Sequence, residues 1–177
     1  MNPQTSDFLG RTLVSGTLAG LATAATAALA GQRETHSYAA PLNATSHIAW
    51  GNVAAIQDRP SVKYTLTGFL LNHAATTFWA AIYEKLVAPR AGAPETSMLK
   101  PLLGAAAVTA GAYVTDYYLV PQRFTPGYEM RLSNRSLAAI YGMLALGLVA
   151  RTLMQRQRGQ GFRRTGAAVR LPDRAPA

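Results

Sequence analysis

The stretch that decides the fold class is TLVSGTLAGLATAATAALA, residues 12–30, and it contains no charged side chain. A helix of about 20 apolar residues is long enough to cross the hydrocarbon core of a bilayer. A helix on the surface of a soluble bundle instead carries polar residues that repeat along one face at the helical period. Because residues 12–30 offer water no charged face, we predict that they form a transmembrane helix.

Three further blocks have similar length and composition, at residues 64–86, 101–121 and 136–154. The first contains His73, the second contains Asp116, and the third has no charge before Arg151. Charged residues make up 14% of the chain, compared with roughly 25% in average soluble proteins. The sequence therefore predicts an all-α protein, in which residues 1–154 form an integral membrane bundle of four transmembrane helices.

The positions of Lys and Arg predict the orientation, because basic residues are enriched in cytoplasmic segments. With the N-terminus inside, eleven of the 17 basic residues lie in inner segments and six lie in the outer loops. We therefore expect the N- and C-termini to lie in the cytoplasm.

Residues 155–177 are basic and contain few apolar residues, a composition typical of a disordered tail. The net charge of +9 is concentrated toward this end, and a basic end on an apolar chain favours anionic lipid headgroups as partners over nucleic acid. A homo-oligomer or a second membrane protein is also compatible with the sequence. The arginines that we expect at the lipid surface are Arg156, Arg158, Arg163 and Arg164.

The first block has two interpretations. Residues 28–30, Ala-Leu-Ala, resemble a signal-peptidase site, so the block could be a cleaved signal peptide. However, its apolar stretch is longer than a usual signal-peptide core. It also carries small residues every four positions, a spacing that lets two helix backbones approach closely in lipid. We therefore expect a retained helix whose packing stripe is formed by Gly16, Gly20, Ala24 and Ala28.

The first outer loop, residues 31–63, is too long to be a simple connection. Apolar residues fall on one helical face and polar residues on another. This pattern predicts a short amphipathic helix lying at the outer membrane interface, with Trp50 as its anchor. The apolar face consists of Leu42, Ala49, Val53 and Ile56, and the other face of Asn43, His47 and Trp50.

Polar residues at membrane depth are the candidate functional residues, because ionisable groups are costly there. Helical spacing places His73 and Asp116 within about one turn of each other in depth, on helices two and three. We predict a polar cluster in the outer half of the bundle, in which His73 and Asp116 share a hydrogen-bonded network with Tyr113 or Tyr117 and Arg123 closes it. The cluster comprises His73, Tyr113, Asp116, Tyr117, Arg123, His47 and Asn43.

Three interpretations of this cluster stay open: structural hydrogen bonding and ion pairing, a proton or ion relay, and a metal site of two histidines and a carboxylate. Lipid or quinone binding is a further one. Glu84, at the inner end of its block, is expected to be solvated or to pair with Arg151. The chain contains no cysteine, no Gly-rich phosphate loop and no GxSxG or HExxH motif, so we expect neither an enzyme nor a bound cofactor or metal.

Three segments carry a resemblance to a known family. They are PLNATSH at 41–47, Asn72-His73 with the following Phe-Trp79 and Tyr-Glu84, and DYYLVP at 116–121 with PGYE at 126–129. In these segments the chain resembles a group of uncharacterised proteobacterial four-helix inner-membrane proteins, over most of residues 10–153. Its layout is also similar to that of the YagU-like inner-membrane proteins, which are associated with acid tolerance. These resemblances imply an inner-membrane location and supply no catalytic residue.

Taken with the spans, they lead us to expect a structural or accessory membrane protein that acts in envelope or acid-stress maintenance. The first alternative is a small proton or solute transporter that uses a His73/Asp116 relay. The second is a membrane-embedded metal-binding protein or enzyme.

Overall fold

The computed structural model describes residues 2–88 and 97–168, with side chains of the last helix described as far as residue 157. Four long helices make up most of it: α1 (Pro3–Thr35), α4 (Thr67–Leu86), α5 (Leu99–Val114) and α6 (Asn134–Ala168). One π-helical turn, Val62–Leu66 (η2), leads into α4, and a second, Thr115–Leu119 (η3), continues α5. Shorter elements are α2 (Ala40–Thr45), α3 (His47–Trp50) and the 3₁₀ turns η1 (Asn52–Ala54), η4 (Gln122–Phe124) and η5 (Tyr128–Met130). No strand occurs among these residues, so the predicted all-α class is correct.

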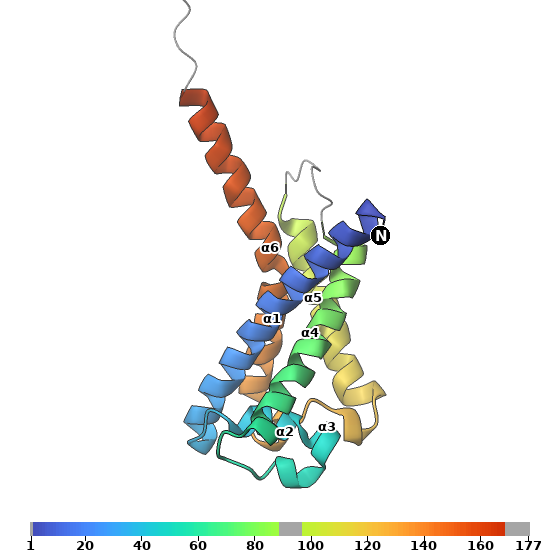
Figure 1. Cartoon of the computed structure of the whole chain (residues 1–177), viewed down its shortest axis with the longest axis vertical. Coiled ribbons are helices and arrows are strands. Elements are labelled where there is room, and N and C mark those ends of the chain that lie inside the picture. The colour runs from blue at the N-terminus through green and yellow to red at the C-terminus, as the bar shows by residue number, and fades with distance from the viewer. Residues whose placement is uncertain (1, 89–96, 169–177) are drawn as a thin grey trace, which may run out of the picture.

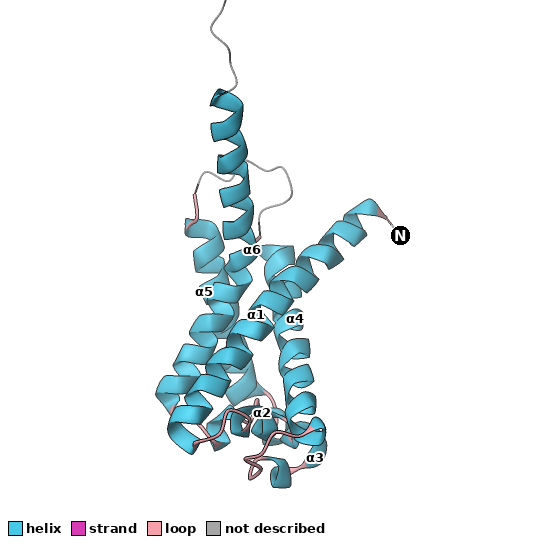
Figure 2. Ribbon diagram, turned by 60° about the vertical axis from the view of Figure 1, so that its left-hand side comes forward, coloured by secondary structure: helices cyan, strands magenta, loops and turns pink. Residues whose placement is uncertain are grey.

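The long helices run alternately in opposite directions, as Figures 1 and 2 show. The N-terminus of α1 and the C-terminal part of α6 lie at one end of the bundle, which we call the terminal end. Helices α2 and α3 lie at the opposite end, the loop end. Both described ends of the chain therefore lie at the same end of the bundle, because the four long helices run along it an even number of times.

Helix α1 packs against α4 and α6 through small residues, which bring the backbones close together. A Cβ atom added to Gly16 would lie 2.7 Å from Thr77 Cα on α4, and one added to Gly20 would lie 2.9 Å from His73 Nδ1. Ala24 is buried and Ala28 is half-buried. Gly16 and Gly20 thus lie in a close contact with α4, as their four-residue spacing predicts.

Two helices, α1 and the first part of α6 (Asn134–Gln157), are long and apolar enough to cross a membrane. Helix α5 has 16 residues before its π-helical turn. The four predicted blocks all coincide with long helices, but membrane-spanning length and composition are found for these two among the described residues.

The loop between α1 and α4 does not form the predicted interfacial amphipathic helix. It folds into two short helices, and all six residues of α2 are buried beneath the ends of α1 and α4. Close approach makes this possible, because a Cβ atom on Gly68 of α4 would overlap the Leu42 carbonyl oxygen. Residues 37–59 therefore form a plug at the loop end, and Trp50 stays at its exposed rim.

One predicted boundary differs. A disordered tail is predicted from residue 155, directly after the fourth span, whereas α6 continues as helix to Ala168. Arg156 is on this helix; the side chains of Arg158, Arg163 and Arg164 lie outside the described ones, as do residues 169–177 and the link at 89–96.

Candidate functional site

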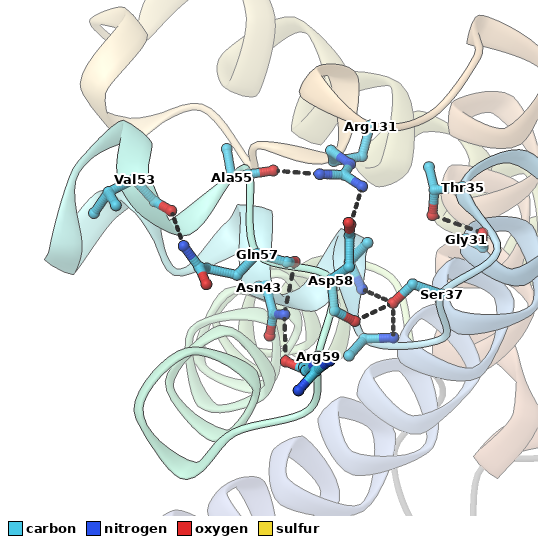
Figure 3. A network of polar contacts seen from close by, with 12 residues as sticks. Gly31, Thr35, Ser37, Asn43, Val53, Ala55, Gln57, Asp58, Arg59 and Arg131 are labelled. Atoms are coloured by element: carbon cyan, nitrogen blue, oxygen red, sulfur yellow. Dashed lines mark hydrogen bonds and ion pairs between the residues drawn. The ribbon is translucent and has the colours of Figure 1, made fainter.

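Asn43 holds the plug together from its centre. Its side-chain amide donates hydrogen bonds to the carbonyl oxygens of Gln57 (2.9 Å) and Arg59 (3.1 Å), and its Oδ1 accepts one from Thr65 (2.6 Å). Arg131 closes the same network from the second loop, bonding the Ala55 carbonyl at 2.8 Å and pairing with Asp58 (Figure 3). Asn43 thus has a structural role in the loop and is not part of an intramembrane cluster with Asp116.

His47 and Arg123 also bond to the plug. His47 is buried, with Nδ1 2.9 Å from the Ala44 carbonyl oxygen, and its Nε2 has no hydrogen-bond partner. Arg123 Nε donates to the carbonyl oxygen of Ile48 at 3.1 Å. The predicted closure of the cluster by Arg123 is therefore wrong, because the guanidinium is used to hold the two loops together.

Asp116 faces α6. It lies in the π-helical turn η3, and its Oδ2 accepts a hydrogen bond from the Tyr141 hydroxyl at 2.6 Å. The rings of Tyr113 and Tyr117 pack around Tyr141, with centroids 5.2 and 6.1 Å from it. The predicted polar face of the third helix thus exists, with Tyr113, Asp116 and Tyr117 together.

His73 lies elsewhere, against α1. Its ring stacks on Phe69, with centroids 6.2 Å apart, and its buried Nδ1 has no hydrogen-bond partner. The predicted hydrogen-bonded network between His73 and Asp116 is not formed. Among the described residues, no three His, Asp or Glu side chains lie close enough together to hold a metal ion, so His47, His73 and Asp116 do not converge.

Asn72, next to His73, connects three segments, although it is not among the predicted site residues. Its amide group donates to Gly20 O and Thr23 Oγ1, both at 3.1 Å, and its Oδ1 accepts from the Tyr128 hydroxyl at 3.0 Å. Burial raises the pKa of Tyr128, which keeps this hydroxyl a neutral donor. An amide in an otherwise apolar block was the signal that could have pointed to it.

A buried ion network lies toward the terminal end. Glu84 is 3% exposed and accepts two hydrogen bonds from Arg151, at 2.8 and 2.7 Å. Ser15 donates a third at 2.5 Å, and Arg11 Nε lies 3.8 Å from the carboxylate. The expected pairing of Glu84 with Arg151 is correct, but the expected solvation of Glu84 is wrong.

A cavity of about 100 Å³ separates the Asn72 and Asp116 groups. Asn72 and Trp79 line it from α4, Asp116 from η3, Tyr141 from α6, and Tyr128 from the second loop. Among the described residues, a half-buried carboxylate, hydroxyls and aromatic rings meet around this space.

These features define a helical bundle with polar groups in its interior and a plugged loop end. No protein-family model, curated protein or solved structure matches the chain.

Proposed function

We propose that this chain is an integral protein of the bacterial inner membrane, with four transmembrane helices and both termini in the cytoplasm. Its role is structural or accessory rather than enzymatic, and its partners are lipids. The acid-stress role rests on the likeness to the YagU-like proteins described above.

The observation that carries the membrane proposal is the inverted distribution of side chains. Large apolar side chains point outward on all four long helices, including Leu13 (57% exposed), Phe78 (59%), Leu103 (61%) and Leu146 (54%). Glu84, Arg151 and Asn72 are buried between the same helices. A protein in water leaves single apolar residues exposed, but bands of them on every helix suit contact with lipid tails.

The structural role is supported by how the interior is used. Glu84 ties α1, α4 and α6 together at the terminal end, and Asn72 ties α1 and α4 to the second loop. His73, the residue required for a proton relay, lies so close to α1 that a Cβ atom added to Gly20 would be 2.9 Å from its Nδ1. Buried polar groups that join helices, as Glu84 and Asn72 do, support a scaffold better than a conduction path.

The chain contains no cysteine, so the topology can be tested by single-cysteine labelling. Gln57→Cys in the plug should react with a membrane-impermeant maleimide added to intact spheroplasts. Ser6→Cys in α1 and Gln155→Cys in α6 should react only after permeabilisation. Labelling of Ser6→Cys in intact spheroplasts would show that the orientation is the reverse of the proposed one. Extraction of the protein from membranes by carbonate would contradict the proposal that it is an integral membrane protein.

A small transporter is the second candidate, favoured by the cavity beside Asp116. Purified protein in liposomes, tested with a pH-sensitive dye and a panel of small solutes, separates the two. The structural proposal predicts fluxes equal to those of empty liposomes. A flux that disappears in Asp116→Asn would favour the transporter instead.

A further inference from the structure

Asp116 is a carboxylate within the bundle that has no basic partner. Among the described residues, Asp7, Asp58 and Glu84 pair with arginines, and Glu34 accepts hydrogen bonds from two serines. Asp116 accepts one side-chain hydrogen bond, from the neutral hydroxyl of Tyr141. The nearby carboxylate Glu129, held by Thr125 and Tyr117, adds a second negative charge. A carboxylate in such a setting is stabilised either by a bound proton or by a partner of opposite sign.

The cavity beside Asp116 limits the size of that partner. Its volume of about 100 Å³ is smaller than the roughly 150 Å³ of an apolar cavity known to hold benzene. A quinone ring with its tail or a lipid chain is too large to enter it entirely. Ala75, which lines the cavity from α4, is exposed on the surface of the bundle, and the cavity is partly open rather than enclosed.

The walls indicate the chemical class of the partner. Four aromatic side chains line the cavity with Asp116: Trp79, Phe124, Tyr128 and Tyr141. Aromatic faces attract organic cations, most strongly where water is excluded, and a carboxylate supplies the compensating charge. A bare metal cation would need several free oxygen ligands. The remaining walls combine Leu71, Ile140 and Leu144 with oxygen atoms that already have hydrogen-bond partners, those of Thr23, Thr45, Asn72 and Thr76.

We propose that this cavity is a binding site for a small organic cation, such as a methylated ammonium, with Asp116 as its counter-ion. The Tyr141 hydroxyl positions the carboxylate from α6. The π-helical turn directs Asp116 toward α6, and such turns often occur at functional sites. This inference goes beyond the structural role proposed above and does not depend on transport.

The test uses the full-length protein in detergent with Trp50→Phe, which leaves Trp79 as its one tryptophan. Tetramethylammonium chloride is titrated while Trp79 fluorescence is recorded, with tert-butanol as the neutral probe of similar size and sodium chloride at matched ionic strength. We expect a saturable change with tetramethylammonium alone. Asp116→Asn should weaken binding on the order of 30-fold, the effect of losing one partner of a buried charge pair.

Asp7→Asn makes the same chemical change at an exposed position of α1. It is the matched control and should bind tetramethylammonium like the parent protein. Ala75→Leu fills the cavity from the exposed side of α4 and should abolish the response without lowering the melting temperature, so the proposal stays testable if Asp116→Asn fails to fold. Equal responses to both probes would mean an apolar cavity without cation preference. Such equal responses would overturn the proposal. It would also be overturned if the parent protein gave no saturable response to tetramethylammonium, or if Ala75→Leu bound it unchanged. A topology that differs from the proposed one would leave this binding result intact.

Discussion

At the scale of single residues, the terminal end is organised by one carboxylate. Glu84 and Arg151 lie in the interior, where each would be costly alone, and their paired geometry offsets that cost. The sequence could predict the pair, because both residues lie near the same end of their blocks. It could not predict the burial, because Ser15 and Arg11 belong to α1, and no local pattern shows that α1 covers them.

We predict that removing one partner of this pair is more damaging than removing both. Glu84→Gln or Arg151→Met alone should lower the free energy of unfolding by about 3–5 kcal/mol, because an unpaired buried charge or polar group remains. The double variant should lose less than the sum. Thermal and denaturant unfolding in detergent measures the cycle, with Asp7→Asn as the exposed control. Additive losses would show that the two side chains do not interact.

At the scale of elements, the sequence predicted which residues share a helix face but not which neighbour that face meets. Gly16 and Gly20 form a contact stripe as expected, and the contact is with α4. Tyr113, Asp116 and Tyr117 share a face as expected, but Asp116 bonds α6 and not His73 of α4. Spacing along one helix sets its own faces, whereas the choice of partner depends on side-chain volumes across the whole bundle.

The contact between α1 and α6 gives a matched pair of variants within one helix. A Cβ atom at Gly147 would lie 2.4 Å from Ala19 Cα, a backbone atom that cannot move alone, whereas one at Gly142 meets nothing within 4 Å. Gly147→Ala should therefore lower the melting temperature in detergent. Gly142→Ala should leave it unchanged or raise it, since alanine favours helix over glycine by about 1 kcal/mol. Equal melting temperatures for the two would mean that α1 and α6 are not in close contact.

The start of α6 gives a prediction about pH. Glu34, beyond the expected span 12–30, accepts hydrogen bonds from the Ser133 backbone N–H (2.6 Å) and hydroxyl (2.9 Å), and from the Ser136 hydroxyl. The bond from Ser136 is the main reason that the pKa of Glu34 is lowered from its ordinary value of 4.5. Its stabilising effect is therefore complete above about pH 4.5 and is lost as pH falls through the lower folded pKa.

We expect parent and Glu34→Gln melting temperatures to differ at pH 7 and to converge below pH 4.5. Ser136→Ala should move this convergence to higher pH, because the largest cause of the lowered pKa is removed. A difference between parent and Glu34→Gln that does not change with pH would show that the carboxylate charge does not stabilise the start of α6.

At the scale of the whole molecule, the plug shows where sequence reasoning stops. Periodicity correctly indicated helical structure in the first loop, but α2 is buried on every side. That burial depends on Gly68, on Thr65 bonding Asn43, and on Arg131 reaching Ala55 from 76 residues away in sequence. A pattern within the loop cannot report such distant partners.

The last prediction concerns the first helix as part of the whole bundle. If residues 1–30 were removed as a signal peptide, Glu84 would lose Ser15 and Arg11, and Asn72 would lose Gly20 and Thr23. The faces of α4 and α6 that α1 covers would also be exposed. Retention of α1 is therefore required for the buried groups to keep their partners. Intact-mass measurement of the protein purified from membranes should give the full 18.8 kDa, allowing for loss of Met1. Ala30→Arg blocks the signal-peptidase site and should change the measured mass only by the substitution itself. If the parent protein instead gives a product that begins at Gly31, and this product is absent from Ala30→Arg, then α1 is cleaved.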